Sequence, residues 1–93
     1  MKGNMMNWNL TIPQAISHAE KYNFDGKLIS REVDGSITST TYGASIQRSK
    51  KLANALTKLG VKLHDRVGTI AWNNSRHFET YFAVSGMGAV LHT

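Results

Sequence analysis

The sequence predicts an α/β fold in which a β-hairpin and two helices lead into a β–α–β unit. Three observations predict it. Two β-rich runs flank an Asp-Gly pair, apolar residues recur at helical spacing in three segments, and residues 66–93 place one such segment between two short apolar runs. Short strand–helix–strand connections imply parallel strands joined by a right-handed crossover.

The first part of the chain is expected to form a helix and then a hairpin. Thr11 is a plausible N-cap and Pro13 falls in the first turn, which predicts a helix from about Ile12 to Tyr22. The Asp-Gly pair between two β-rich runs is typical of a tight hairpin. We therefore expect hairpin strands near Lys27–Val33 and Ser36–Thr40.

A long amphipathic helix should follow. Thr41 is placed to cap a helix from about Tyr42 to Leu59, and Gly60 is the expected residue just after its end. One side of this helix is apolar or small, which indicates packing against a sheet. That side carries Tyr42, Ile46, Ser49, Ala53, Leu56 and Gly60, widened by Leu52 and Leu59.

The last part of the chain predicts the β–α–β unit. The run Arg66–Trp72 is expected to be a strand buried on both faces, and Ala89–Thr93 to begin a second buried strand. Between them lies a helix from about Arg76 to Gly86, capped by Asn74 or Ser75. Because a parallel pair needs helices on both faces, we expect these elements to be the first piece of a larger α/β domain.

The chain carries a net positive charge, and its charged residues are unevenly distributed along the sequence. The net charge is +5, from 11 Lys and Arg against six Asp and Glu, and no acidic residue falls between Asp34 and Asp65. Such an excess indicates either a surface for nucleic acid, phosphate or anionic lipid, or a solvated helix face. The solvated face is favoured, because no aromatic residues accompany the charges at a stacking spacing.

Composition and motifs point to no catalytic or metal-binding group within the chain. It has no Cys, which excludes disulfides and is compatible with a cytoplasmic location, and no apolar run approaches the ~20 residues of a membrane helix. His18, His64, His77 and His92 lack the spacing of a metal site. No Gly-x-Ser-x-Gly or Gly-x-x-x-x-Gly-Lys motif occurs, so we expect no catalytic, cofactor-binding or metal-ligating residue.

A series of motifs resembles one known family. In chain order they are Thr41-Tyr42, Leu56-x-x-Leu59-Gly60-Val61-Lys62, Asp65-Arg66-Val67, Trp72-Asn73 and Gly88-Ala89-Val90. With them, roughly residues 27–93 resemble the N-terminal region of the acyl-adenylate-forming enzymes, most closely the fatty-acid–CoA ligases. The pairs Trp72-Asn73 and Arg76-His77 and the ending Leu91-His92-Thr93 favour the medium- and long-chain acyl branch. His64 departs from the family pattern, which usually has Gly before the Asp, and we expect only a relaxed turn there.

The resemblance implies a function for a longer enzyme. That enzyme would activate a fatty acid with ATP and Mg²⁺ to an acyl-adenylate and then transfer the acyl group to CoA. The family's phosphate loop, Thr-Glu pair, ribose-binding Asp and C-terminal Lys have no counterpart in residues 1–93. We therefore expect residues 1–93 to be a partial N-terminal region of an AMP-binding domain, without a second domain and inactive by itself.

Three residues are candidates for the wall of a ligand cleft. In open α/β sheets, ligands bind beyond the carboxyl ends of parallel strands. Trp72 and Asn73 end one predicted strand and His92 ends the next, so they could line or buttress the acyl or nucleotide cleft of the complete enzyme. The alternative, which we favour, is that Trp72 packs in the core and Asn73 caps the following helix.

Two further interpretations stay open. The chain could be a free-standing small basic module that binds nucleic acid or another anionic partner. Alternatively, exposed sheet edges on Val67–Trp72 and Ala89–Thr93 could drive self-association of the chain. The resemblance itself implies fatty acid, ATP and CoA as partners, with no specific nucleic acid.

Overall fold

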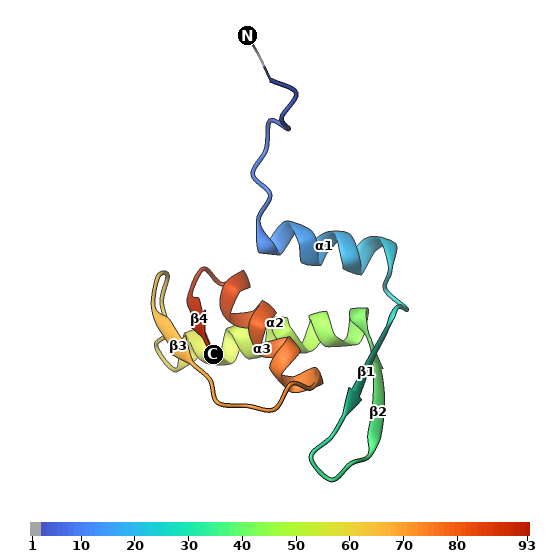
Figure 1. Cartoon of the computed structure of the whole chain (residues 1–93). Coiled ribbons are helices and arrows are strands. Elements are labelled where there is room, and N and C mark those ends of the chain that lie inside the picture. The colour runs from blue at the N-terminus through green and yellow to red at the C-terminus, as the bar shows by residue number, and fades with distance from the viewer. Residues whose placement is uncertain (1–2) are drawn as a thin grey trace.

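The computed structural model describes residues 3–93 and contains three helices and four strands. Figure 1 shows α2 and α3 packed together at the centre, with the hairpin at the start of α2 and an extended N-terminal arm leading into α1. The elements are α1 (Ile12–Tyr22), β1 (Lys27–Arg31), β2 (Ile37–Thr41), α2 (Tyr42–Lys58), β3 (Arg66–Gly68), α3 (Ser75–Gly86) and β4 (Val90–His92). The predicted α/β order is therefore confirmed.

Strands β1 and β2 form the expected antiparallel hairpin, with a longer turn than predicted. The predicted strands Lys27–Val33 and Ser36–Thr40 run too far into a turn that spans five residues. The Asp34 carboxylate accepts hydrogen bonds from the Ser36 hydroxyl at 2.6 Å and the Ser36 backbone N–H at 2.9 Å, which hold the pKa of Asp34 below its ordinary value. Gly35 has a positive φ of 87°. Asp and Gly thus make the turn as predicted, but as part of a wider loop.

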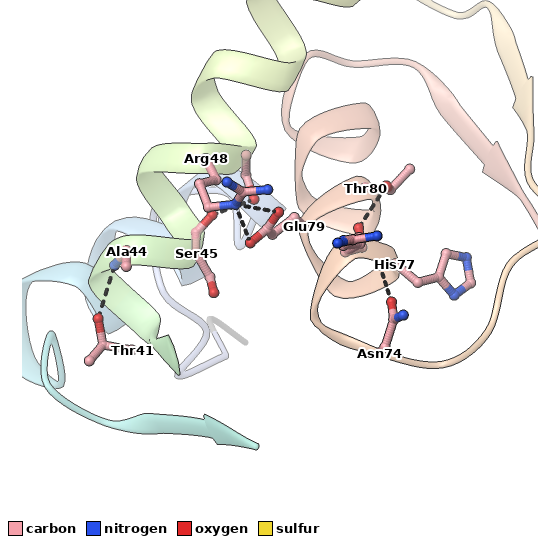
Figure 2. Close-up of polar contacts among 10 residues, drawn as sticks. Thr41, Ala44, Ser45, Arg48, Asn74, His77, Glu79 and Thr80 are labelled. Carbon is pink, nitrogen blue, oxygen red and sulfur yellow. Dashed lines mark hydrogen bonds and ion pairs between the residues drawn. The ribbon is translucent and has the colours of Figure 1, made fainter. Parts of the chain in front are cut away.

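Helix α2 begins and ends close to where the sequence predicts. The Thr41 hydroxyl accepts a hydrogen bond from the Ala44 backbone N–H at 3.1 Å, which caps the first turn (Figure 2). At the other end Gly60 has a φ of 100°, the left-handed conformation expected after a helix. Ile46 is buried as predicted, whereas Leu59 is 82% exposed and does not widen the buried stripe.

The core of the chain lies between α2 and α3. Ile46 on α2 and Ala83 and Val84 on α3 are buried, and these two helices share the most extensive contact between any two elements. At the same interface Arg48 Nε donates to both carboxylate oxygens of Glu79, at 2.9 and 3.0 Å (Figure 2). The side chain of Glu79 is only 8% exposed, so Arg48 supplies the partner that a buried carboxylate needs.

Strands β3 and β4 are parallel, as predicted, but they are shorter and more exposed to solvent than expected. They pair from Arg66 with Val90 to Gly68 with His92, so the predicted strand Arg66–Trp72 has only three residues. Trp72 and Val90 are exposed, and the expectation of strands buried on both faces is wrong for this chain. The physical reason is that a parallel sheet is buried only when layers cover both of its faces.

Helix α1 lies against the central pair without burying any of its residues. Glu20 attaches it to α2, since its carboxylate accepts hydrogen bonds from Lys50 Nζ at 2.8 Å and Gln47 Nε2 at 2.6 Å. The hydrogen bond from Lys50 is the main reason that the pKa of Glu20 is lowered. Within residues 3–93, none of the helices has the length and hydropathy needed to cross a bilayer.

His64 occupies a backbone position that favours glycine. Its φ is +69°, and among residues 3–93 it is the one residue other than glycine with a positive φ. Its backbone N–H donates to the Gly88 carbonyl at 2.9 Å, which ties the turn before β3 to the entry of β4. The turn is therefore strained by His64 rather than relaxed by it, because a side chain in this region clashes with the following carbonyl.

We predict that His64→Gly stabilises the chain by about 0.5–1 kcal/mol, because relief of the left-handed strain exceeds the added entropy of the unfolded state. Urea unfolding measures the change. Lys62→Gly, in the same turn but without a positive φ, is the matched control and should lower stability. Equal destabilisation by both substitutions would contradict the account.

Candidate functional site

The candidate site is the loop of residues 69–74, which leads from the carboxyl end of β3 to α3. Because β3 and β4 are parallel, their carboxyl ends lie at the same edge of the sheet. Trp72 and Asn73 lie on the loop, and His92 is the last residue of β4. The loop leaves the sheet at the edge where open α/β sheets bind ligands.

Trp72 and Asn73 form one side of a surface groove. The other side is the end of β1 and the hairpin turn, through Arg31, Glu32 and Val33, and the groove has a volume of about 280 Å³. His92 is not among the residues that line it. The carbonyl of His92 instead accepts a hydrogen bond from the Thr69 backbone N–H at 2.8 Å, which extends the sheet by one bond. The structure thus brings two of the three candidate residues together and leaves the third at the sheet.

The alternative roles for Trp72 and Asn73 are not what the structure shows. Trp72 is 72% exposed and does not pack in the core of this chain. The cap of α3 is Asn74, whose side-chain oxygen accepts a hydrogen bond from the His77 backbone N–H at 3.2 Å (Figure 2). Asn74 was one of the two predicted caps of this helix, and that prediction is confirmed. Asn73 makes no cap and stays free to face the groove.

Glu32 joins the hairpin turn to the start of α3. Its carboxylate accepts a hydrogen bond from the Thr38 hydroxyl at 2.7 Å and a longer one from Asn74 Nδ2 at 3.4 Å. The same Asn74 side chain therefore caps α3 and contacts the hairpin. Sequence reasoning missed Glu32, because its partner lies 42 residues away and no local pattern marks the contact.

His77 contacts the first residue of the loop. Its Nε2 lies 3.2 Å from the Thr69 hydroxyl, within hydrogen-bond distance, and its ring packs against the Tyr81 ring with centroids 4.8 Å apart. Either atom can donate, according to the tautomer of the imidazole. In the sequence, His77 was considered as a possible metal ligand and as part of the Arg76-His77 motif, and the structure adds a polar contact with Thr69.

The groove lacks both the cluster of ligands that Mg²⁺ requires and the N–H groups that bind the phosphates of a nucleotide. Within residues 3–93, no three His, Asp or Glu side chains lie close enough together to hold a metal ion. A phosphate site also needs a cradle of backbone N–H groups with a cation, and the sequence has no such loop. The residues of this chain can shape the wall of a cleft, and we derive no step of phosphate chemistry from them.

The chain matches the family described as "AMP-binding enzyme" over residues 17–93. It is 45% identical to a 3-methylmercaptopropionyl-CoA ligase of Ruegeria lacuscaerulensis and 44% identical to a medium-chain-fatty-acid–CoA ligase of Ectopseudomonas oleovorans. Both alignments cover all of this chain and 17% of the relative. An acyl-CoA synthetase structure from Brucella canis superposes with a TM-score of 0.76 at 17% identity, covering 98% of this chain and 17% of that one.

The chain therefore belongs to the AMP-binding enzyme family. Its fold is shared with acyl-CoA synthetases. The chain spans about a sixth of the length of the curated relatives that it matches.

We predict that Asn74→Ala destabilises the chain by about 1 kcal/mol, the typical contribution of an N-cap side chain. The matched control is Asn73→Ala at the neighbouring position, which should change stability by less than about 0.5 kcal/mol. Thermal unfolding followed by circular dichroism at 222 nm measures both. The assignment of the cap would be wrong if Asn73→Ala cost as much as Asn74→Ala.

Proposed function

We propose that this chain forms part of the N-terminal region of an ATP-dependent, AMP-forming acyl-CoA ligase. The complete enzyme would join a fatty acid to AMP and then transfer the acyl group to CoA. The observation that carries the proposal is the family match over residues 17–93, together with relatives 44–45% identical whose names are those of CoA ligases. ATP, Mg²⁺ and CoA would supply the adenylation and thioester chemistry, and we propose the cytoplasm as the location because these metabolites are abundant there.

The proposed contribution of this chain is structural support for one wall of the ligand cleft. Trp72 and Asn73, on the loop after β3, would line the acyl or nucleotide cleft of the complete enzyme, and His92 would buttress it from the end of β4. Their support is that Trp72, Asn73 and His92 are exposed at the carboxyl edge of a parallel pair. An exposed tryptophan offers a large apolar face to an acyl chain or an adenine ring.

The acyl substrate is proposed to be a medium- or long-chain fatty acid. Relatives named for both classes support this: the medium-chain ligase of Ectopseudomonas oleovorans and a long-chain-fatty-acid–CoA ligase of Thermus thermophilus. A short thioether acid is a second candidate, because the 45% identical relative from Ruegeria lacuscaerulensis is named for 3-methylmercaptopropionyl-CoA. Assays with acids of both kinds distinguish the two candidates.

The other two interpretations have less support. Neither the family match nor the relatives favour a nucleic-acid-binding module, and the basic residues Lys51 and Lys58 lie on the exposed side of α2, as a solvated face requires. Self-association through β3 and β4 stays a prediction. The exposed Trp72 and Val90 support it, and the dependence of molecular mass on concentration is its test.

We predict that the 93-residue chain alone forms no acyl-CoA, because the phosphate loop, Thr-Glu pair and C-terminal Lys that the family resemblance implies have no counterpart in residues 1–93. A hybrid enzyme tests the positive part of the proposal. In it, this chain replaces the aligned segment of the Ruegeria lacuscaerulensis ligase, and the hybrid should form thioester in a reaction that depends on ATP, Mg²⁺ and CoA.

The control for the hybrid is Val84→Asp, which places a charge at a fully buried position and should abolish activity through misfolding. Thioester formation by the isolated chain, or a well-folded hybrid without activity, would contradict the proposal. AMP release with each acid measures both activity and acyl preference.

A further inference from the structure

We propose that His77 is a positioning residue that holds both ends of the loop of residues 69–74. The part of this inference that concerns ligands rests on the proposed function. The part that concerns the loop rests on the structure alone. His77 would act through the loop and would not itself touch a substrate.

The ring of His77 fixes the beginning of the loop. Its Nε2 is 3.2 Å from the hydroxyl of Thr69, the first residue after β3. Thr69 is also held by its backbone N–H, which donates to the His92 carbonyl at 2.8 Å. Tyr81, one turn further along α3, packs on the imidazole and restricts its rotation. The beginning of the loop is thus attached to both the sheet and α3.

The backbone of His77 fixes the end of the loop. Its N–H donates to Asn74 Oδ1 at 3.2 Å, and the Asn74 backbone N–H in turn donates to the Trp72 carbonyl at 3.0 Å. Figure 2 shows the Asn74 side chain directed at the first turn of α3, with the His77 ring extending from the same turn toward the preceding loop. One residue of α3 therefore contacts the first and last residues of the loop.

The middle of the loop depends on these two ends. Across residues 3–93, the bond to the Trp72 carbonyl is the only hydrogen bond that involves residues 70–73. Ile70 is fully exposed and Trp72 is 72% exposed, so neither is fixed by burial. A short segment with few bonds and exposed side chains is held mainly by its attachment points.

The consequence for function is that His77 sets the position of the groove wall. Trp72 and Asn73 form the loop side of the groove, opposite the hairpin turn. A wall that is displaced or mobile would bind the acid or the nucleotide less well, because ordering it on binding costs free energy. We therefore expect loss of the Thr69–His77 contact to raise KM more than it lowers kcat.

The test uses a matched pair at Thr69 and one variant at His77. Thr69→Val keeps the shape of the side chain but removes the hydroxyl, whereas Thr69→Ser keeps the hydroxyl. His77→Phe keeps a ring against Tyr81 and the backbone N–H that caps α3, but removes Nε2. The first measurement is amide hydrogen exchange at residues 69 and 74 in the 93-residue chain, because their N–H groups donate to the His92 and Trp72 carbonyls at the two ends of the loop. The amide of Val84 monitors global folding.

We expect exchange at residues 69 and 74, relative to the intrinsic rate of each amide, to become about fivefold faster in Thr69→Val and His77→Phe, the factor that one neutral hydrogen bond represents. Exchange in Thr69→Ser and at Val84 should be unchanged. Combining Thr69→Val with His77→Phe should add little, because both remove the same contact. If Thr69→Val and His77→Phe exchange like Thr69→Ser, the proposed positioning role is wrong.

The second measurement is made in the hybrid ligase. Thr69→Val should raise KM for the carboxylic acid or ATP by about fivefold while kcat stays within roughly twofold, and Thr69→Ser should match the unsubstituted hybrid. A loosened loop with an unchanged KM for both substrates would overturn the role in the cleft and leave the ligase proposal intact. An inactive unsubstituted hybrid would count against the ligase proposal, whereas hydrogen exchange would still decide the role of His77 in the loop.

Discussion

The ion pair between Arg48 and Glu79 is the interaction on which the arrangement of the helices and strands in this chain depends. It joins α2 to α3 in a part-buried contact, through two hydrogen bonds from one guanidinium nitrogen to one carboxylate. A carboxylate with 8% of its side chain exposed would be costly without a partner, since burial removes most of its hydration. The Arg48 side chain is 62% exposed, so the pair loses little hydration on that side.

The other elements contact this helix pair directly, except β3, which is placed by its pairing with β4. The hairpin runs directly into α2 at Thr41, and α3 contacts β1 and β4. Helix α1 contacts both central helices and is attached by the exposed bonds of Glu20. The loop that carries Trp72 and Asn73 is attached to the same pair through His77 and to the hairpin through Glu32. The geometry of the candidate groove is therefore a consequence of how α2 and α3 pack.

The sequence predicts the helices of this chain well and its long-range contacts poorly, for a physical reason. Helix limits follow from local chemistry, such as Thr41 at one end of α2 and Gly60 after the other, and both are where they were expected. The contacts of Arg48 with Glu79 and of Glu32 with Asn74 span 31 and 42 residues, and no local pattern encodes them. Arg48 was counted in the basic excess before the structure gave it an acidic partner.

The errors at the strands have a different origin. Hydrophobic runs such as residues 66–72 predict burial, but burial depends on layers that cover the sheet, and these 93 residues cover only part of it. The three candidate cleft residues were found from the rule that ligands bind at the carboxyl ends of parallel strands. That rule identifies the edge of the sheet where a ligand binds, but it does not say which side chains at that edge lie together. It therefore could not distinguish Trp72 and Asn73, which line one groove, from His92, which does not line it.

A double-mutant cycle on the free energy of unfolding tests the central role of the Arg48–Glu79 contact most directly. The cycle compares Arg48→Met, Glu79→Gln and the double variant with the unsubstituted chain, and a parallel cycle on Lys50 and Glu20 serves as the exposed reference. We expect a coupling energy of about 1.5–3 kcal/mol for the first pair and less than about 1 kcal/mol for the second. A coupling for Arg48 and Glu79 no larger than that of the exposed pair would contradict the account, because α2 and α3 would then be held by apolar packing alone.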